Sequence, residues 1–308
     1  MAIPGQRDLD LTRKVLTEWL AARLPDATHL SLSELHAPGG TGFSNETFMF
    51  DADRSEGSAH RTEGLVLRIA PTGYQIFLEA DFERQYRLLE VLDRESDVPV
   101  PPVRWFESDA SLLGAPFFVM GKVDGDAAPD SPSYNTAGWL HDATQEERRA
   151  VWTAAMDALV RIHRVPTELV SFLAKPELGP TGLDQQLTYW ERSLEWASQG
   201  RPQPTAEATW AWLAANVPSA RPTALSWGDA RIGNILFRDG RAAAVVDWEM
   251  LSLGGRQADL GWWLFLDAFH SFSAPRLAGL GTRQETIDLW EEQTGEHAGD
   301  LEWYEVFA

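Results

Sequence analysis

Residues 226–234 (SWGDARIGN) and residues 235–249 (ILFRDGRAAAVVDWE), which follow directly, decide the fold of this chain. Asn234 lies five residues after Asp229, and a short predicted hairpin then leads to Asp247. Phosphoryl transfer from Mg²⁺–ATP needs a carboxylate to accept the acceptor's hydroxyl proton, together with an amide oxygen and a second carboxylate to hold the metal. In the alternative interpretation, Asp229 and Asn234 are turn residues and Asp247 caps a strand. Three oxygen-bearing side chains around one hairpin favour the phosphoryl-transfer interpretation.

The sequence on both sides of this hairpin is mostly helical in pattern. Thr144, followed three residues later by Glu147, is typical of a capping box that begins a helix. By apolar periodicity, helices are predicted over residues 145–163, 183–196, 205–216, 256–269, 282–292 and 301–308. In this part of the chain, strand patterns are found at 225–237 and 242–246.

The first 124 residues show a different pattern, with short strands and few helices. Helical spacing predicts an opening helix over 8–24 and one main helix over 76–92. Short alternating or apolar runs predict strands at 29–36, 47–51, 65–69, 103–107 and 116–120, with a polar separator at 52–64. The fold class is therefore α+β. We expect a small antiparallel-sheet lobe over residues 1–124 that binds nucleotide, and a larger helical lobe over 125–308 that carries the catalytic loop.

The composition excludes several classes of function. The chain has 308 residues, a hydrophobic fraction of 44%, no cysteine, and a net charge of −20 from 26 basic and 46 acidic side chains. Without cysteine there is no thiol nucleophile, disulfide or cysteine-built metal site. The acidity argues against nucleic-acid binding, and no apolar run approaches the roughly 20 residues that cross a bilayer. We expect a soluble, cytoplasmic protein without nucleic-acid or membrane partners, and leave its oligomeric state open.

The glycine-rich segment 39–45 (GGTGFSN) lies between two predicted strands. A dinucleotide-binding fingerprint requires a third glycine and a following helix, and both are missing here. Between strands, such a loop is suited to covering phosphates with its backbone amides, although a plain tight turn is an equal alternative. The chain also lacks the P-loop, zinc-protease and hydrolase motifs.

Several motifs in order resemble those of the aminoglycoside phosphotransferase-like kinases, which share the protein-kinase fold. The motifs are GFSNETF, LVLRIAP, FERQYRLL, the run VPVPPVRWFESDASLLGAPFFVMGKVDG, SWGDARIGNILF, VVDWEMLSLGG and ADLGWW. The chain is most similar to a branch that resembles the phosphotransferase domain of acyl-CoA dehydrogenase fusion proteins. The resemblance covers nearly the whole chain and implies a bilobal, protein-kinase-like fold with ATP and Mg²⁺ as cofactors.

The resemblance also assigns roles residue by residue. It makes Asp229 the catalytic base, Asn234 and Asp247 the magnesium ligands, and Asp259 a buried carboxylate that holds the catalytic loop. The implied nucleotide-binding residues are the loop Gly42, Phe43, Ser44 and Asn45, the pair Arg68 and Gln85, and Met120, Gly121 and Val123 at the hinge. In the family, backbone groups at positions such as Gly121 and Val123 hold adenine.

Three positions depart from the family pattern. Arg68 stands where relatives carry a phosphate-binding lysine, and Gln85 where they carry its glutamate partner. An arginine can grip phosphate in a fork but places its charge differently from an ammonium group. Trp227 replaces a structural histidine before Gly-Asp. The altered pair leaves two hypotheses, an active small-molecule kinase and a nucleotide-binding pseudokinase without turnover.

The phosphate acceptor is predicted to be a hydroxyl group of a small molecule. Aminoglycosides, hydroxyacyl thioesters, choline-like alcohols and sugar alcohols all stay open, as does GTP in place of ATP. Asp124, Asp126 and Glu249 are candidates for holding a cationic acceptor. His163 is interpreted as a packed or capping residue, and the scattered tryptophans as core, with some lining an acceptor pocket. The family usually continues with further helices after a segment such as 301–308, so part of that pocket is expected to lie beyond this sequence.

Overall fold

The structure is a computed structural model that describes residues 7–38, 46–72, 75–79, 81–272 and 274–308. The chain divides into two compact units, Met1–Glu90 with Pro101–Val123 and Val91–Val100 with Asp124–Ala308. We call them the N-terminal and C-terminal units. The assignment of nucleotide binding to 1–124 and of the catalytic loop to 125–308 stays a prediction. Within the described residues, no helix combines the length and apolar character that crossing a membrane requires.

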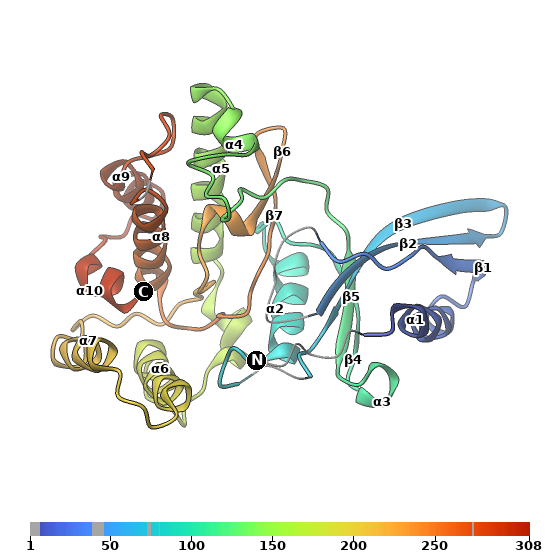
Figure 1. The fold of residues 1–308 in the computed structure, drawn as a ribbon, viewed down its shortest axis with the longest axis horizontal. Helices are drawn as coiled ribbons and strands as arrows, with labels where there is room; N and C mark the ends of the chain where they lie inside the picture. The colour runs from blue at the N-terminus through green and yellow to red at the C-terminus, as the bar shows by residue number, and fades with distance from the viewer. Residues whose placement is uncertain (1–6, 39–45, 73–74, 80, 273) are drawn as a thin grey trace. The chain divides into compact units, whose positions relative to one another are not determined.

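The N-terminal unit is built on a five-stranded antiparallel sheet in the order β1-β2-β3-β5-β4 (Figure 1). The strands are β1 (Ala27–Leu32), β2 (Glu46–Glu56), β3 (Ala59–Ile69), β4 (Val103–Glu107) and β5 (Phe117–Gly121). Their inward-facing side chains are mostly aliphatic or aromatic and are buried. The sheet confirms the α+β prediction for this part of the chain.

One prediction for this sheet was wrong, namely the polar separator at 52–64. Strands β2 and β3 stay in register through this stretch, from Glu46 opposite Ile69 to Glu56 opposite Ala59. A two-residue turn with Gly57 in the left-handed region (φ 61°) connects them. In the outer half of the hairpin, many side chains are solvent-exposed and several form ion pairs. The sequence there therefore shows no alternating apolar pattern that would predict a strand. Hydrogen bonds between the two backbones extend both strands into this polar stretch, and the hydropathy pattern of the sequence gives no sign of them.

The helices α1 (Leu9–Arg23) and α2 (Phe82–Glu95) cover opposite faces of the sheet. Trp19 of α1 packs on Phe117 with ring centroids 4.8 Å apart, and Phe82 of α2 packs on Phe118 at 5.0 Å. Consecutive strand residues point to opposite faces, which places the two helices on different sides. The expected start of the main helix at 76 was wrong, because Ile76 is 40% exposed and the helix begins at Phe82. A short helix, α3 (Ala110–Leu113), precedes β5.

The C-terminal unit is mostly helical, with one two-stranded sheet (Figure 1). Its elements are α4 (Trp139–Asp142), α5 (Gln145–His163), the 3₁₀ helix η1 (Thr167–Leu173), α6 (Gly182–Ser198), α7 (Pro204–Ala215), the 3₁₀ turn η2 (Ile232–Asn234), β6 (Ile235–Arg238), β7 (Arg241–Val245), α8 (Arg256–His270), α9 (Arg283–Thr294) and α10 (Leu301–Phe307). The predicted start and end of α5 and its capping box between Thr144 and Glu147 are confirmed.

The strand predicted over 225–237 is shorter than expected. Only Ile235–Arg238 pairs as β6, and the residues before it form a loop ending in η2. Gly228 has φ 94°, and a Cβ there would lie 2.3 Å from the Met250 carbonyl oxygen. Glycine therefore lets the chain turn sharply before Asp229, and this turn excludes a continuous strand.

Candidate active site

One buried carboxylate on α8, that of Asp259, accepts hydrogen bonds from the loop before β6. Asp259 has no solvent exposure, and its two oxygens accept hydrogen bonds from the Trp227 and Gly228 backbone N–H groups, each at 2.8 Å. The Ser226 hydroxyl donates to the same carboxylate at 2.7 Å. These three contacts fix the backbone of the loop just before Asp229.

A buried histidine completes the surroundings of Asp259. The indole N–H of Trp290 donates to His163 Nδ1 at 2.9 Å, and His163 Nε2 lies 3.1 Å from Asp259 Oδ2. Because an indole only donates, Nδ1 is the acceptor and Nε2 carries the proton that is given to Asp259. His163 is thus a packed, hydrogen-bonded histidine and takes no direct part in the loop.

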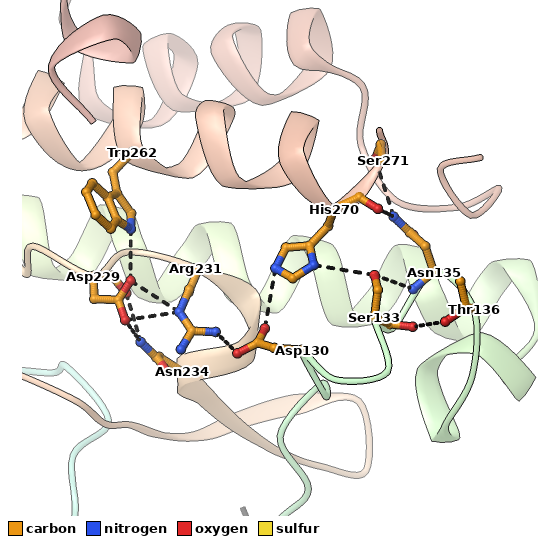
Figure 2. A network of polar contacts seen from close by, with 10 residues as sticks. All are labelled: Asp130, Ser133, Asn135, Thr136, Asp229, Arg231, Asn234, Trp262, His270 and Ser271. Carbon is orange, nitrogen blue, oxygen red and sulfur yellow. Dashed lines mark hydrogen bonds and ion pairs between the residues drawn. The ribbon is translucent and has the colours of Figure 1, made fainter. Parts of the chain in front are cut away.

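Asp229 is held by three donors (Figure 2). Arg231 Nε lies 3.1 and 3.0 Å from its two carboxylate oxygens, and the Asn234 side-chain nitrogen lies 2.6 Å from Oδ2. The indole N–H of Trp262, which extends from α8, donates to Oδ1 at 2.8 Å. The carboxylate is therefore fixed in orientation by neutral and cationic donors.

The guanidinium group of Arg231 contacts a second carboxylate besides that of Asp229. Its Nη1 forms an ion pair with Asp130, whose other oxygen lies 3.4 Å from His270 Nε2 (Figure 2). Burial by itself lowers the pKa of Arg231, but the carboxylates of Asp229 and Asp130 outweigh it and raise that pKa above its usual value. Burial also lowers the pKa of His270, with Asp130 acting in the opposite direction. Arg231 is thus a permanent cation between two carboxylates.

Asn234 and Asp247 lie at the same end of the β6–β7 hairpin. Asn234 precedes β6, Asp247 follows β7, and the Val246 N–H donates to the Asn234 carbonyl at 2.9 Å. Asp247 has φ 60°, a left-handed conformation that aspartate tolerates better than most residues. The buried indole of Trp227 donates to the carbonyls of Val246 and Asp247, at 3.0 and 3.1 Å. Trp227 therefore holds the backbone at Asp247.

The predicted phosphate-binding pair lies in the N-terminal unit. Arg68 is half-buried on β3, with its guanidinium carbon 6.0 Å from the ring centroid of Phe118. Gln85 on α2 is 4% exposed, and its buried Oε1 accepts no hydrogen bond in the part of the chain that the structure describes. A buried acceptor in this state can still accept a hydrogen bond from a donor that approaches it.

The predicted adenine-binding segment forms the end of β5 and the residues after it. The Gly121 N–H donates to the Pro102 carbonyl at 2.8 Å, so that donor is already used. The backbone groups predicted to bind adenine are therefore reduced to the Gly121 carbonyl and those of Val123. Met120 precedes them on β5. The predicted phosphate-covering loop Gly42, Phe43, Ser44 and Asn45 lies outside the described residues.

A model of the phosphotransferase enzyme family matches residues 37–295, which is most of the chain. The chain belongs to this family. The match spans the loop with Asp229 and Asn234, the hairpin to Asp247, and Asp259 on α8.

Similar proteins agree with this assignment. Mouse acyl-CoA dehydrogenase family member 10 is 31% identical over 64% of this chain and 18% of its own length. The chain spans between 18% and 27% of the length of the first curated relatives, all acyl-CoA dehydrogenase family members. Among solved structures, a candidate aminoglycoside phosphotransferase from Ralstonia eutropha is 24% identical with a TM-score of 0.67, covering 94% of this chain and 83% of that one. A complex of aminoglycoside phosphotransferase APH(4)-Ia with ADP and hygromycin B is 17% identical with a TM-score of 0.59, covering 94% and 87%. The predicted family and kinase-like fold are confirmed.

The donor set at the hairpin suits magnesium. Mg²⁺ prefers oxygen ligands and commonly takes one or two from the protein, with phosphates and water completing its shell. The Asn234 nitrogen is engaged by Asp229, which leaves its side-chain oxygen for a cation, and Asp247 adds a carboxylate. No cluster of three or more His, Cys, Asp or Glu side chains suited to a metal occurs among the described residues. A metal at the hairpin would therefore share its shell with a nucleotide.

Three contributors to this site were not predicted from the sequence. Arg231, Trp262 and Asp130 all join the network around Asp229 (Figure 2). Arg231 stands inside the quoted motif, and its spacing of two residues from Asp229 is a signal that could have been used. Asp130 precedes Arg231 by 101 residues, and no local pattern links them.

Proposed function

We propose that this chain is an ATP- and Mg²⁺-dependent phosphotransferase that moves the γ-phosphate of ATP to a hydroxyl group of a small molecule. The observation that carries the proposal is the contact between Asp229 and Asn234 at the hairpin end that also bears Asp247. The proposed base and the two proposed metal ligands thus stand on one loop and the hairpin that follows it. The family match and the solved relative that binds ADP and hygromycin B support the same reaction class.

Asp229 acts as the base in this proposal. Its contacts with Arg231, Asn234 and Trp262 orient the carboxylate. As the acceptor oxygen bonds to the γ-phosphorus, its proton passes to Asp229, and ADP departs with the electron pair of the broken P–O bond. A positioned base of this kind contributes on the order of 10²–10⁴-fold in rate.

Asn234 and Asp247 are the proposed magnesium ligands. When bound, the metal neutralises charge that develops on the phosphate oxygens. Trp227 supports this role indirectly, since its indole N–H holds the Asp247 carbonyl and so fixes where that residue's side chain begins. Asp259 positions the loop through the backbone of Trp227 and Gly228.

The N-terminal unit supplies the proposed nucleotide-binding groups. We assign phosphate binding to Arg68, with Gln85 accepting a hydrogen bond from its guanidinium group in the loaded enzyme. The buried Oε1 of Gln85, which accepts no hydrogen bond from any described residue, supports this assignment. Residues 42–45 would cover the triphosphate, and Met120, Gly121 and Val123 would bind adenine through the strand-end backbone.

The test is ADP release from Mg²⁺–ATP with a panel of alcohol acceptors, in wild type and in Asp229→Asn. Turnover is expected to fall by about 10²–10⁴-fold in the variant, while ATP binding measured by calorimetry is retained. Asp239→Asn is the matched control, because Asp239 is exposed in the turn of the same hairpin and has φ 53°, which asparagine tolerates.

Two results would contradict the proposal. Undiminished turnover in Asp229→Asn would remove the base assignment. Tight, Mg²⁺-dependent ATP binding without turnover of any acceptor would favour the nucleotide-binding pseudokinase. The sequence argument for that alternative is the altered pair, in which Arg68 and the uncharged Gln85 stand in place of lysine and glutamate.

A further inference from the structure

Asp130 lies far from the loop before β6 in the sequence, but its side chain contacts a residue of that loop. It belongs to the segment between β5 and α4, and its carboxylate forms an ion pair with Arg231 Nη1 (Figure 2). The Nε atom of the same guanidinium group lies 3.1 and 3.0 Å from the two carboxylate oxygens of Asp229. Arg231 thus bridges two carboxylates, one of which is the proposed base.

The glycine at position 233 leaves room for this ion pair. A Cβ atom there would lie 2.6 Å from Arg231 Nη1 and 3.0 Å from Asp130 Oδ1, closer than ordinary van der Waals contact allows. Any side chain at Gly233 would therefore push the head group of Arg231 away from Asp130. The close approach of two side chains thus explains why the loop carries a glycine at this position.

The segment that carries Asp130 is attached to the C-terminal end of α8. His270 Nε2 lies 3.4 Å from the Asp130 carboxylate, and the side-chain amide of Asn135 donates to the His270 carbonyl oxygen at 3.1 Å. Tyr134 is buried, and its ring centroid lies 4.9 Å from that of His270. These contacts hold Asp130 in place although its side chain is 44% exposed.

One face of α8 contributes to the surroundings of the proposed base at three places. Asp259 accepts hydrogen bonds from the loop backbone, and Trp262, three residues later, donates to Asp229. His270, eight residues after Trp262, contacts Asp130. Intervals of three and eight residues keep side chains on one side of an α-helix. The same helix therefore orients Asp229 directly and also fixes the carboxylate that holds its arginine partner.

The contact with Asp130 selects which donor Arg231 presents to the base. A guanidinium group carries five N–H donors in one plane and can approach a carboxylate with any of them. Arg231 presents Nε to Asp229 while Asp130 holds Nη1. Without Asp130, the terminal nitrogens would be free to turn toward Asp229 and grip it in a fork, as arginine commonly does with carboxylates. The orientation of the Asp229 carboxylate would then change.

We propose that Asp130 is a positioning residue for phosphoryl transfer and acts on Asp229 through Arg231. The proposal rests on the proposed phosphotransferase function and adds a residue to its machinery. The effect falls on the chemical step, because the contact orients the proposed base. ATP binding is unaffected, because none of the proposed nucleotide-binding residues takes part in the contact.

The test measures ADP release from Mg²⁺–ATP in wild type, Asp130→Asn, Arg231→Met and the double variant. The acceptors are an aminoglycoside, choline, a sugar alcohol and a hydroxyacyl thioester, and the one that wild type turns over fastest is used for comparison. Asp130→Asn keeps the size of the side chain and removes its charge. Its kcat is expected to fall by about tenfold or more, toward the roughly 10²-fold that a misplacement on the order of 1 Å costs, with the KM for ATP unchanged.

The double variant tests whether Asp130 acts through Arg231. In the Arg231→Met background the guanidinium group is absent, so adding Asp130→Asn is expected to change kcat by less than about twofold. The matched control is Asp142→Asn, which is expected to keep wild-type turnover. Asp142 is also an aspartate beside a histidine, with Oδ1 2.8 Å from His141 Nδ1, but its side chain is 77% exposed on α4.

A second measurement follows the contact without requiring turnover. The imidazole of His270 is titrated by NMR, with its signal assigned by comparison with His270→Gln. Burial has the largest effect on the pKa of His270 and lowers it, whereas Asp130 raises this pKa and Arg231 lowers it. Asp130→Asn is therefore expected to lower the pKa of His270, and Arg231→Met to raise it. Asp267, which also raises this pKa, is the same in both variants.

Three results would overturn the positioning role. They are a kcat for Asp130→Asn equal to that of the Asp142→Asn control, a full additional loss when Asp130→Asn is combined with Arg231→Met, and a pKa of His270 that does not move in Asp130→Asn. Failure of the proposed function looks different, because wild type itself would then release no ADP with any of the four acceptors. That result contradicts the phosphotransferase and the positioning role together.

Discussion

Replacing Asp259 with asparagine should destabilise the C-terminal unit and slow catalysis together. One carboxylate oxygen accepts from Ser226 and from the Gly228 N–H, and the other from the Trp227 N–H and from His163. Asparagine has a single acceptor oxygen. Whichever way its amide is turned, two of the four buried donors face an NH₂ group and lose their acceptor.

The expected size follows from those two donors. A buried donor left without an acceptor costs about 1–3 kcal/mol, so the free energy of unfolding should fall by about 2–6 kcal/mol. For a domain of 150–250 residues each kcal/mol lowers Tm by roughly 2–4 °C, so a loss of roughly 4–24 °C is expected. His163 cannot compensate by moving its proton to Nδ1, because that atom accepts the Trp290 indole N–H.

Thermal unfolding followed by circular dichroism measures the loss, and ADP release measures the slower turnover. Asp93→Asn makes the same chemical change on an exposed part of α2 and serves as the control. A Tm for Asp259→Asn within about 2 °C of that control would refute the reasoning that these four hydrogen bonds hold the loop.

Three further perturbations follow from the same contacts. Trp227→Phe keeps the buried ring but removes the indole donor to the Asp247 carbonyl, so the Mg²⁺ concentration for half-maximal ADP release should rise; an unchanged Mg²⁺ titration would contradict this. Arg231→Met removes one bifurcated, charge-assisted hydrogen bond from Nε to the two Asp229 oxygens, worth about 1.5–3 kcal/mol, so kcat/KM should fall by roughly 10–150-fold in steady-state assays, and wild-type kinetics would count against it. In the folded protein, burial lowers the pKa of His270 below its ordinary value of 6.5. As pH falls through 6.5, the unfolded chain therefore binds more protons at this histidine than the folded protein does, and the free energy of unfolding should fall. His270→Gln should show a smaller loss of Tm between pH 7 and pH 5, and equal losses in both proteins would exclude this source.

Local sequence patterns were sufficient wherever neighbours along the chain make the contact. The hairpin from Asn234 to Asp247 brings those residues to one end because β6 and β7 are joined by a two-residue turn. Helix α5 begins where Thr144 and Glu147 cap each other, three residues apart. Such features depend on the spacing of residues along the chain, which the sequence gives directly.

Patterns of hydropathy failed where backbone pairing or solvent exposure decided the outcome. Strands β2 and β3 run through the polar stretch 52–64 because their N–H and C=O groups pair with each other whatever the side chains are. Helix α2 begins later than its periodicity indicated because Ile76 is exposed and finds no core to pack against.

The sequence by itself determined where the proposed base and metal ligands lie along the chain, because Asp229, Asn234 and Asp247 stand on one loop and the hairpin that follows it. Only the tertiary structure decided what surrounds them. Trp262 reaches Asp229 across 33 positions and Asp130 reaches Arg231 across 101. These contacts depend on how α8 and the segment before α4 pack against the loop. Because packing between distant segments leaves no periodic trace in the chain, the orientation of the Asp229 carboxylate became visible only in three dimensions.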